Sequence, residues 1–437
     1  MENEKYKKSR YTFECMDGEN AVVYSAATDR MLVLIPQLYE LYRKHENHLH
    51  DLKNVHKEFF NALAYSGIIV SEECNETEAL VDFWGKQDNS PASFSITINP
   101  TLDCNLRCWY CYEKKNKGSR MSDVVLDSVK KLIAVKTGSN ELRELSLSFF
   151  GGEPLMQFDD IVKPLILFAD ELCGKKDIAL KLAFTTNATL LTENAVKFLK
   201  PYNGKYPVFW QITLDGNREA HNRTKFETKQ GDAFAASVNS IRMLASEGMG
   251  VQVRLNYTGA NLPTFVDLPA EFEGLDENCK KLLKFDFHRV WQDKSRIDKD
   301  KLDNVKEVFK KEGLNVMPSN ELSPTRCYAD KQNCVVVNYN GDIFKCTARE
   351  FAHELREGDL LEDGTVRFNP LFERRMKIKF ENPTCKECCI YPLCWGGCTQ
   401  SKIEHDDLKG CSQGYSEKTK QELVEKRIKE LLALNKQ

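Results

Sequence analysis

The chain has 437 residues, which suggests two to four domains, and its 41% hydrophobic share is enough for cores of ordinary size. Its 62 Lys and Arg residues nearly balance its 65 Asp and Glu residues, so the formal net charge of -3 favours neither nucleic acid nor an anionic membrane. The first residues lack the apolar core of a secretory signal, and no stretch of about 18 apolar residues could span a bilayer. We therefore expect a cytoplasmic protein that binds no nucleic acid and no membrane.

Residues 1–88 are expected to form a small α/β segment ahead of the main domain. Apolar runs predict strands at 21–24 and 67–70, and helical spacing of apolar residues predicts helices over 31–43 and 51–64. The acidic, polar stretch 72–89 then predicts a domain boundary.

From residue 93 the pattern becomes a regular alternation of strand and helix. The predicted strands are 93–99, 145–150, 180–184, 208–214, 251–257 and 283–290, and the predicted helices are 123–134, 161–172, 193–199, 233–245, 262–271 and 299–311. Six such units imply a parallel sheet with right-handed crossovers, yet about 200 residues are few for a closed eight-fold barrel. The predicted fold class is α/β, with a partial (β/α)6 barrel over 93–312 and its site at the carboxyl ends of the strands.

Residues 320–415 are poor in long periodic segments and rich in Cys. A hairpin is predicted over 335–344, with Asn340-Gly341 as a type I′ turn. Residues 416–437 predict a charged, amphipathic terminal helix.

Sixteen cysteines are unevenly distributed along the chain. Four are scattered singly and are predicted to be small buried hydrophobes: Cys15, Cys74, Cys173 and Cys279. Three more fall within residues 104–111 and nine within residues 327–411. A secreted disulfide protein would normally be short and carry an export signal, so the clustered thiols are predicted to be metal ligands.

The first group, Cys104, Cys108 and Cys111, has the spacing C-x3-C-x2-C and directly follows the first predicted barrel strand. A structural zinc site normally takes four protein ligands. Iron–sulfur clusters are also held by Cys thiolates, and three thiolates on a four-iron cluster leave one iron open to a small ligand. The spacing alone leaves both interpretations open.

This run resembles the signature of radical S-adenosylmethionine enzymes, with Tyr110 at the family's aromatic position. Three further segments at predicted strand ends resemble family motifs in the same order. They are Gly151-Gly152-Glu153-Pro154 (the GGEP motif), Thr186-Asn187-Ala188 (a TNG-type segment) and Thr213-Leu214-Asp215-Gly216 (an S-x-D-G segment with Thr for Ser). Ala188 stands where Gly is usual, which weakens the expectation of a left-handed backbone there.

The resemblance implies a [4Fe–4S] cluster on the three thiols and bound S-adenosylmethionine. In the family, the GGEP segment hydrogen-bonds the methionyl ammonium, and polar groups of the S-x-D-G segment would face the ribose and the methionine. Arg254 is predicted, from its polarity alone, to pair with the methionyl carboxylate; an ordinary salt bridge is the alternative. The predicted cofactor contacts are Tyr110, Gly151, Gly152, Glu153, Thr186, Asn187, Thr213, Asp215 and Arg254. No catalytic acid or base is predicted.

The second Cys group resembles the SPASM domain of a large radical enzyme subgroup, whose full pattern holds two auxiliary [4Fe–4S] clusters. Carried over by position, the first cluster would use Cys327, Cys334, Cys346 and Cys398, and the second Cys385, Cys388, Cys394 and Cys411. Cys389 is left over, and its exchange with Cys388 as a ligand stays open. A zinc ribbon also uses C-x2-C pairs but does not explain so many thiols.

The resemblance implies an enzyme that generates a 5′-deoxyadenosyl radical and modifies a ribosomally made peptide by a thioether, a carbon–carbon cross-link or another C–H functionalisation. The expected partners are a precursor peptide, bound in part by a winged-helix-like element in residues 1–88, and a reductant such as flavodoxin or ferredoxin. One alternative is an anaerobic sulfatase-maturing enzyme, although that group has Asp directly after the cysteine corresponding to Cys346, where this chain has Thr347. The other alternative is a non-catalytic iron–sulfur protein for electron transfer or partner binding.

Overall fold

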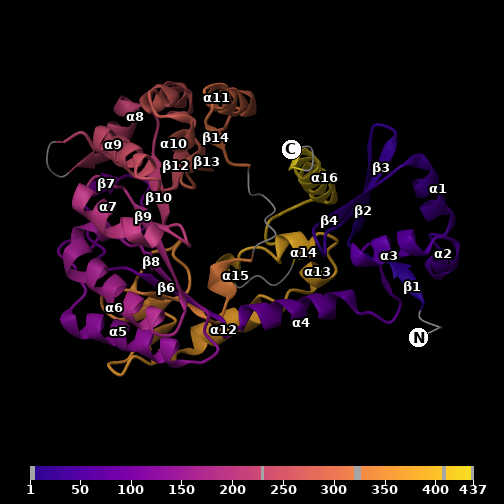
Figure 1. Ribbon diagram of the computed structural model, residues 1–437, viewed down its shortest axis with the longest axis horizontal. Coiled ribbons are helices and arrows are strands. Elements are labelled where there is room, and N and C mark those ends of the chain that lie inside the picture. The colour runs from indigo at the N-terminus through magenta and orange to yellow at the C-terminus, as the bar shows by residue number, and fades with distance from the viewer. Residues whose placement is uncertain (1–4, 228–230, 319–325, 406–409, 435–437) are drawn as a thin grey trace. The chain divides into compact units, whose positions relative to one another are not determined.

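The computed structural model describes residues 5–227, 231–318, 326–405 and 410–434 (Figure 1). The chain divides into two compact units. The cysteine-rich unit comprises residues 1–89, 320–331 and 373–437, and the barrel unit comprises residues 90–319 and 332–372. No helix among the described residues is long and apolar enough to cross a membrane.

One sheet forms the frame of the barrel unit, with eleven strands in the part of the chain that is described. Their spatial order is β14 (Asn315–Val316), β13 (Leu283–Arg289), β12 (Val251–Tyr257), β10 (Phe209–Leu214), β9 (Ala179–Thr186), β8 (Glu144–Phe149), β6 (Ser93–Ile98), β15 (Cys334–Val337), β16 (Asp342–Phe344), β17 (Gly358–Leu360) and β18 (Val366–Phe368). Pairing is parallel from β14 to β15 and antiparallel beyond it. All six predicted barrel strands are present as parallel neighbours, so the predicted α/β fold with a partial barrel is confirmed.

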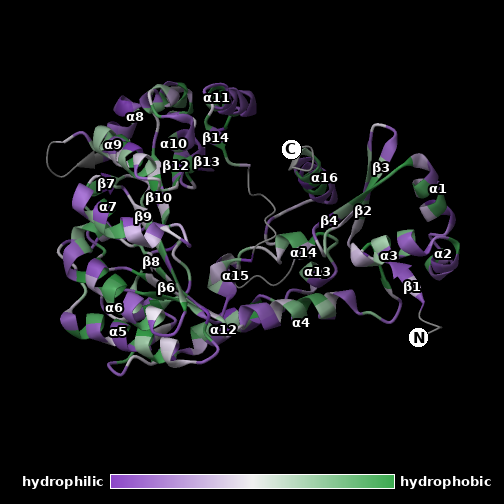
Figure 2. Cartoon of the chain, in the orientation of Figure 1, coloured by the Kyte–Doolittle hydropathy of each residue, from purple (hydrophilic) through white to green (hydrophobic). Residues whose placement is uncertain are grey.

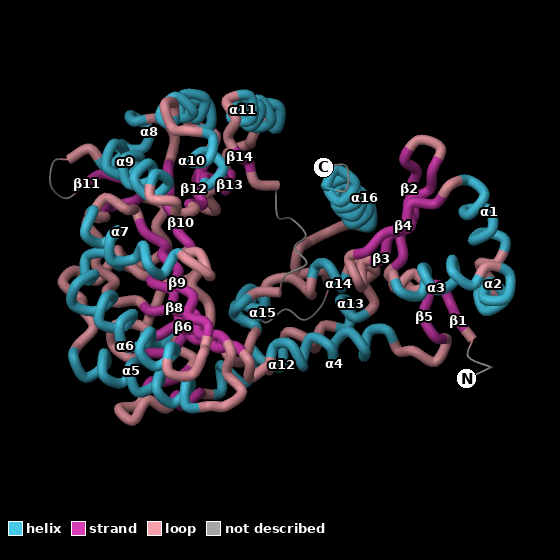
Figure 3. Tube along the Cα trace, in the orientation of Figure 1, coloured by secondary structure: helices cyan, strands magenta, loops and turns pink. Residues whose placement is uncertain are grey.

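Helices follow the strands as the alternating pattern predicts (Figure 3). They are α5 (Asp123–Gly138), α6 (Lys163–Gly174), α7 (Glu193–Leu199), α8 (Arg218–Thr224), α9 (Ala233–Ser246), α10 (Glu277–Leu282) and α11 (Lys299–Lys311), with short 3-10 or π segments η1 (Pro154–Gln157), η2 (Phe158–Val162), η3 (Lys200–Asn203), η4 (Leu262–Phe272), η5 (Tyr328–Asp330) and η6 (His353–Leu355). The segment at 262–272 is a 3-10 helix, where an ordinary helix was predicted. Pro269 lies inside it and has no N–H to donate to the preceding turn.

The two faces of the sheet differ in chemistry. Along β6, Phe94, Ile96 and Ile98 are buried in the core that the helices cover, whereas Ser95 and Thr97 are only half-buried. The same alternation recurs on the other strands, whose residues Figure 2 colours by hydropathy. It produces a polar face whose further members are Ser146, Ser148, Thr185, Gln211, Thr213, Gln252, Arg254, Asn256, Asp286 and His288. Because side chains alternate along a strand, the barrel has a polar interior surface.

The predicted hairpin over 335–344 is present, but its turn is not the predicted type I′ turn. Val337 pairs with Ile343, and the amide of Asn338 donates to the carbonyl of Asp342, so the loop is longer than two residues. Only Gly341 has a positive φ, of 85°, whereas a type I′ turn needs positive φ at both central residues. β15 joins the barrel sheet beside β6.

The cysteine-rich unit begins with two small sheets and a set of helices. Its strands are β1 (Tyr6–Lys8) paired with β5 (Ile69–Ser71), and β2 (Thr12–Asp17), β3 (Asn20–Ser25) and β4 (Arg30–Leu34) in that order. Its helices are α1 (Pro36–Lys44), α2 (Leu49–Val55), α3 (Lys57–Tyr65), α4 (Glu76–Asp88), α13 (Pro383–Lys386), α14 (Tyr391–Cys394), α15 (Thr399–His405) and α16 (Glu417–Leu434), while α12 (Pro370–Ile378) crosses the boundary between the units.

Two predictions for the N-terminal segment were wrong in detail. Residues 31–34 form strand β4, because they pair with β3 instead of entering the predicted helix. The helix predicted over 51–64 is two helices separated at His56, whose side chain caps the second. The polar stretch 72–89, where a domain boundary was predicted, contains helix α4.

Helix α4 is held by aromatic and charged residues far along the chain. Trp84 is 1% exposed and packs against the rings of Tyr391 and Trp395 at 5.0 and 4.7 Å between centroids. The guanidinium of Arg326 lies 5.2 Å from the Trp84 ring and contacts Asp88 at 2.7 Å. Residues 1–88 and the C-terminal cysteine segment therefore share one hydrophobic core.

Candidate functional site

The three thiols of the first group lie on the loop that follows β6. Part of this loop is β7 (Leu106–Cys108), which pairs with β11 (Lys225–Glu227), so that Cys108 lies opposite Lys225. Cys104 is 5% exposed, and its sulfur accepts from the Leu106 amide at 3.4 Å and from Asn187 Nδ2 at 3.7 Å. The loop is thus braced by the segments that follow β9 and β10.

The electrostatics of these thiols suit a bound metal centre. Burial raises the pKa of Cys108 to about 12, and the neighbouring charges of Cys111 and Cys104 add to the rise. Burial lowers the pKa of Lys115, but the negative charges of Cys104, Cys111, Glu113 and Cys108 together outweigh this effect, and the net shift of the pKa is upward. Thiols of this kind lose their protons when a metal binds, and Lys115 would then balance part of the negative charge.

Gly151 and Gly152 allow the β8 loop to lie directly on the cysteine loop. A Cβ on Gly152 would lie 1.9 Å from the carbonyl oxygen of Asp103, and one on Gly151 would lie 2.6 Å from that of Thr101. Gly151 also has a φ of 97°, which a side chain would strain. These two glycines therefore allow the β8 loop to pack closely against the backbone just before Cys104.

Glu153 joins the ends of two strands. Its carboxylate is fully buried and accepts from Thr186 Oγ1 at 2.6 Å, from the Leu155 amide at 2.9 Å and from the Asn187 amide at 2.8 Å. Burial raises the pKa of this carboxyl, and the three donors oppose that rise. The predicted contacts Glu153, Thr186 and Asn187 therefore form one network beside the cysteine loop.

Ala188 takes a left-handed backbone conformation although it stands where the family usually has Gly. Ala188 has a φ of 60° and is fully buried. Its amide donates to Thr186 Oγ1 at 2.9 Å, and its carbonyl accepts from Ser240 Oγ at 2.8 Å. These bonds hold a conformation that costs an alanine roughly 1 kcal/mol.

Asp215 lies at the centre of a second buried network. Its side chain is 0% exposed, and Oδ1 accepts from the Tyr110 hydroxyl at 2.8 Å. Oδ2 faces the ammonium of Lys225, itself 3% exposed, at 3.2 Å. Tyr110 belongs to the cysteine loop and Lys225 to the strand paired with it, so Asp215 connects the end of β10 to the cysteine loop.

The remaining predicted contacts lie next to this network on the polar face. Arg254 stands beside Thr213 in the sheet register, and its Nε donates to Asn256 Oδ1 at 3.2 Å. Asn256 Nδ2 donates to the Tyr110 hydroxyl at 3.1 Å, and the carbonyl of Thr213 accepts from Lys225 at 3.0 Å. All nine predicted contacts thus belong to the two networks or to the loops beside them.

Two histidines near this site, the buried His221 and the half-buried His288, predict a loss of stability in acid. Burial lowers the pKa of His288 to about 4, and that of His221 well below its usual value. In the unfolded chain both protonate near pH 6.5, so the unfolded state binds more protons between about pH 6.5 and 4. Stability should therefore fall with pH through this window, His288 contributing about 2 kcal/mol after allowance for its partial exposure.

Urea unfolding of the wild-type chain and of His288→Gln at pH 7 and pH 4.5 tests this expectation. The wild type should lose more stability than the variant on acidification. An equal loss in both proteins would contradict the role of His288.

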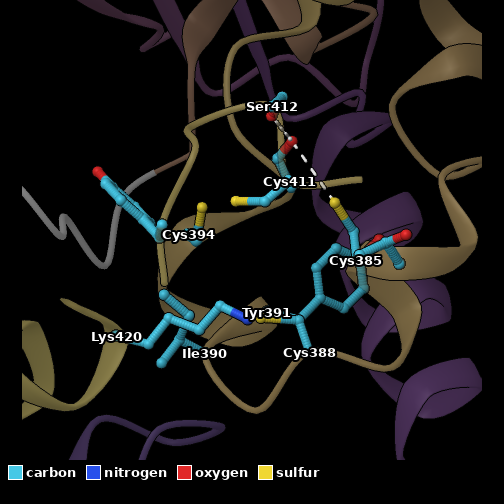
Figure 4. A pocket seen from close by; sticks show the side chains of 11 residues that line it. Cys385, Cys388, Ile390, Tyr391, Cys394, Cys411, Ser412 and Lys420 are labelled. Carbon is cyan, nitrogen blue, oxygen red and sulfur yellow. Dashed lines mark hydrogen bonds between the residues drawn. The ribbon is translucent and has the colours of Figure 1, made fainter. Parts of the chain in front are cut away.

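The cysteines of the second auxiliary group line one pocket of the cysteine-rich unit. Its lining includes Cys385, Cys388, Cys394 and Cys411, together with Lys420 (Figure 4). Among the described residues, Cys388 lines this pocket and Cys389 does not. Figure 4 shows the sulfur atoms of Cys394 and Cys411 pointing toward each other.

The geometry of these thiols differs from that of a site for a single ion. Within the described ranges, no three His, Cys, Asp or Glu side chains converge closely enough to hold one metal ion. In a four-iron cluster each thiolate binds a different iron, so the ligands need not converge in that way. The four thiols that line the pocket are the donor set that such a cluster requires.

The predicted ligands of the first auxiliary cluster are divided between the two units. Cys334 begins β15 and Cys346 follows β16 in the barrel unit, whereas Cys327 and Cys398 are exposed residues of the cysteine-rich unit. This ligand set remains a prediction.

Sequence reasoning missed several residues that the structure brings to these sites. Lys225, His221 and Lys115 follow no motif, and only their contacts reveal them. Asn256 and His288 could have been found from the sequence. Asn256 lies two residues after Arg254 on β12, and His288 lies two residues after Asp286 on β13, so the residues of each pair share one face of the sheet.

Residues 98–266 match the radical SAM superfamily. The chain contains a radical SAM domain. This finding confirms the resemblance seen in the strand-end motifs. The superfamily implies S-adenosylmethionine and one [4Fe–4S] cluster as cofactors, as predicted.

The chain is similar to curated proteins of different kinds, among them a sulfatase-maturating enzyme and a bacteriocin biosynthesis protein. The chain is 28% identical over 162 residues to a cysteine-type anaerobic sulfatase-maturating enzyme of Clostridium novyi (strain NT), over 35% of this chain and 40% of that protein. It is 22% identical over 331 residues to the antilisterial bacteriocin subtilosin biosynthesis protein AlbA of Bacillus subtilis (strain 168), over 70% of this chain and 67% of that protein. The match thus spans less than half of the first relative.

Two solved structures share the fold. One is native anSMEcpe with bound AdoMet and Cp18Cys peptide, with a TM-score of 0.57 and 19% identity over 78% of this chain and 98% of that chain. The other is Streptococcus suis SuiB bound to precursor peptide SuiA, with a TM-score of 0.50 and 16% identity over 92% and 98%. The protein therefore has the fold of SPASM-type radical SAM maturases.

Proposed function

We propose that this protein is a radical SAM enzyme that modifies a ribosomally made peptide. The observation that carries the proposal is the contact of the loop bearing the three thiols with the strand-end networks of Glu153 and Asp215. Two structural neighbours contain a bound peptide, namely anSMEcpe with Cp18Cys peptide and SuiB with the precursor peptide SuiA. They support a peptide as the substrate of this protein.

S-adenosylmethionine, bound with a cluster at Cys104, Cys108 and Cys111, would supply a 5′-deoxyadenosyl radical that takes a hydrogen atom from the substrate. The residues of the chain position that chemistry. Asn187 orients Cys104, and the Tyr110 hydroxyl is fixed by Asp215 and Asn256. Arg254 lies on the polar face next to them, where it would pair with a carboxylate.

Two auxiliary clusters form the second part of the proposal. The pocket thiols Cys385, Cys388, Cys394 and Cys411 would hold one cluster, and Cys327, Cys334, Cys346 and Cys398 the other. Clusters with four thiolates have no open iron, so they suit electron transfer better than substrate binding. A flavodoxin or ferredoxin would serve as the external reductant.

Anaerobic reconstitution tests this cluster count. Three [4Fe–4S] centres should give about twelve irons per chain, together with 5′-deoxyadenosine and a modified peptide when substrate is supplied. The iron assay should be paired with mass spectrometry of the peptide. A fully active preparation with about four irons would exclude both auxiliary clusters.

The N-terminal sheet is the proposed leader-binding element. Within the described chain, the order β2-β3-β4 leaves β4 at an edge of its sheet. Val33 on this strand is 48% exposed, and Ile35, which follows it, is 52% exposed. An apolar sheet edge of this kind can accept an extended peptide as an added strand.

Point substitutions test leader binding better than removal of residues 1–88, because removal would also take Trp84 out of the shared core. Val33→Asp and Ile35→Asp should each weaken the affinity for a leader peptide at least tenfold from a roughly micromolar value. Fluorescence anisotropy with a labelled leader gives this affinity, and unchanged iron content shows that the unit is intact.

Val135→Asp is the matched control, since Val135 is 53% exposed on α5 of the barrel unit. This control should leave leader affinity unchanged. Leader affinity equal to wild type in all three variants would remove β4 from the proposal.

Oxidation of a sulfatase cysteine is the second candidate function, favoured by the relative from Clostridium novyi. The residue after Cys346 is Thr347, so no carboxylate stands at that position. The carbonyl of Thr347 accepts a hydrogen bond from the Tyr112 hydroxyl at 2.9 Å. Incubation with a cysteine-containing sulfatase peptide should therefore give no formylglycine. Formation of formylglycine would instead favour sulfatase maturation over modification of a ribosomally made peptide.

A further inference from the structure

A buried ammonium lies beside the pocket of the second auxiliary group. Lys402 on α15 is 2% exposed, and no hydrogen-bond partner for its Nζ exists among the described residues. A charge taken out of water without a partner is strongly unfavourable, so such groups usually face an opposite charge. Lys402 therefore indicates that a negative group belongs beside it.

The position of Lys402 Nζ indicates that this negative group lies at the thiol of Cys385. A Cβ built on Gly396 would lie 3.0 Å from Lys402 Nζ and 3.7 Å from Cys385 Sγ. Because both distances start from one point, the ammonium and the thiol can be no farther apart than their sum. Burial raises the pKa of Cys385, and the charge of Lys402 opposes that rise.

The backbone between the thiols is shaped to allow this approach. Gly396 and Gly397 both have a φ of 78°, and Trp395 before them has a φ of 58°. The carbonyl of Gly396 accepts from Cys385 Sγ at 3.9 Å and from Ser412 Oγ at 3.2 Å. This left-handed run turns the chain tightly at Gly396, which lines the pocket and which Lys402 Nζ approaches.

A second ammonium approaches the same pocket from another helix. Lys420 on α16 is 9% exposed and lines the pocket. Figure 4 shows its side chain extending toward Cys388. It differs from Lys402 in being paired with the exposed carboxylate of Glu417. Lys402 is thus the buried cation beside these thiols whose charge no described carboxylate offsets.

We propose that Lys402 is a positioning residue whose fixed charge stabilises the reduced form of an iron–sulfur cluster held by Cys385, Cys388, Cys394 and Cys411. This inference rests on the proposed function, which places a cluster in the pocket. A [4Fe–4S]2+ core with four thiolates is a dianion, and one added electron makes it a trianion. A nearby cation favours the more negative state, so Lys402 raises the reduction potential. No bond forms or breaks in this step, and no proton moves.

Lys402→Met removes the charge and keeps an unbranched side chain, whereas Lys402→Arg keeps the charge. Lys418→Met is the matched control, because the Lys418 side chain is 87% exposed on α16. Each full-length, reconstituted protein is titrated with dithionite under electron paramagnetic resonance, and its iron content is measured. In Lys402→Met, one midpoint potential should become more negative by at least about 59 mV, a tenfold change in the reduced-to-oxidised ratio. The other midpoints, and all those of Lys418→Met, should not move.

Lys402→Arg should keep the wild-type midpoint potential, because it keeps the positive charge. If Lys402 only filled space, the midpoint potential would not depend on that charge. Loss of iron in Lys402→Met with retention in Lys402→Arg would also support a role for the charge. The inference is overturned if Lys402→Met keeps its iron and all its midpoints, or if both variants lose iron equally. Failure of the cluster proposal itself has a different signature, namely unchanged iron and spectra in Cys385→Ser.

Discussion

Asp215→Ala is expected to destabilise the barrel unit by about 3–5 kcal/mol, because it leaves the Lys225 ammonium buried without its carboxylate. The substitution also removes the acceptor of the Tyr110 hydroxyl. Urea unfolding of the chain without iron, followed by near-ultraviolet circular dichroism, measures this loss separately from any effect on the cluster.

The chain offers a matched control for this ion pair. Glu219 and Arg223 are 3.9 Å apart on α8 with side chains 87% and 69% exposed, so Glu219→Ala should cost less than about 1 kcal/mol. The double variant Asp215→Leu with Lys225→Met removes both charges and should recover part of the loss. If Asp215→Ala were no more costly than Glu219→Ala, the ion pair would not support the cysteine loop.

The second large effect concerns the two groups of thiols. Replacing Cys104, Cys108 and Cys111 by Ala should reduce 5′-deoxyadenosine formation to background, since the resemblance assigns the S-adenosylmethionine cluster to them. Replacing Cys394 and Cys411, which line the separate pocket, should leave some cleavage of S-adenosylmethionine but abolish the peptide product. Chromatography of 5′-deoxyadenosine and mass spectrometry of the peptide distinguish the two outcomes.

Cys279→Ser is the control for this experiment, because Cys279 belongs to neither group and lies on α10 of the barrel unit. It should retain both products. Because clusters stabilise the segment that holds them, each variant should first be checked for solubility and iron content. Normal 5′-deoxyadenosine formation by the triple variant would contradict the assignment of the first thiol group.

Local sequence patterns determined the barrel. Apolar alternation located all six of its predicted strands, and the motifs were recognised because polar residues follow those strands directly. The terminal helix over residues 417–434 was likewise visible as a periodic pattern. These features depend on neighbours within a few residues, which a single sequence displays.

The tertiary structure alone decided how the site residues are used. Asp215 contacts Tyr110, 105 positions away in sequence, and Trp84 packs against Tyr391. The same holds for the approach of Lys402 to Cys385 and for the choice of Cys388 over Cys389 at the pocket. Such partners meet only when the chain has folded, because burial and hydrogen bonding between distant segments leave no periodic trace in the sequence.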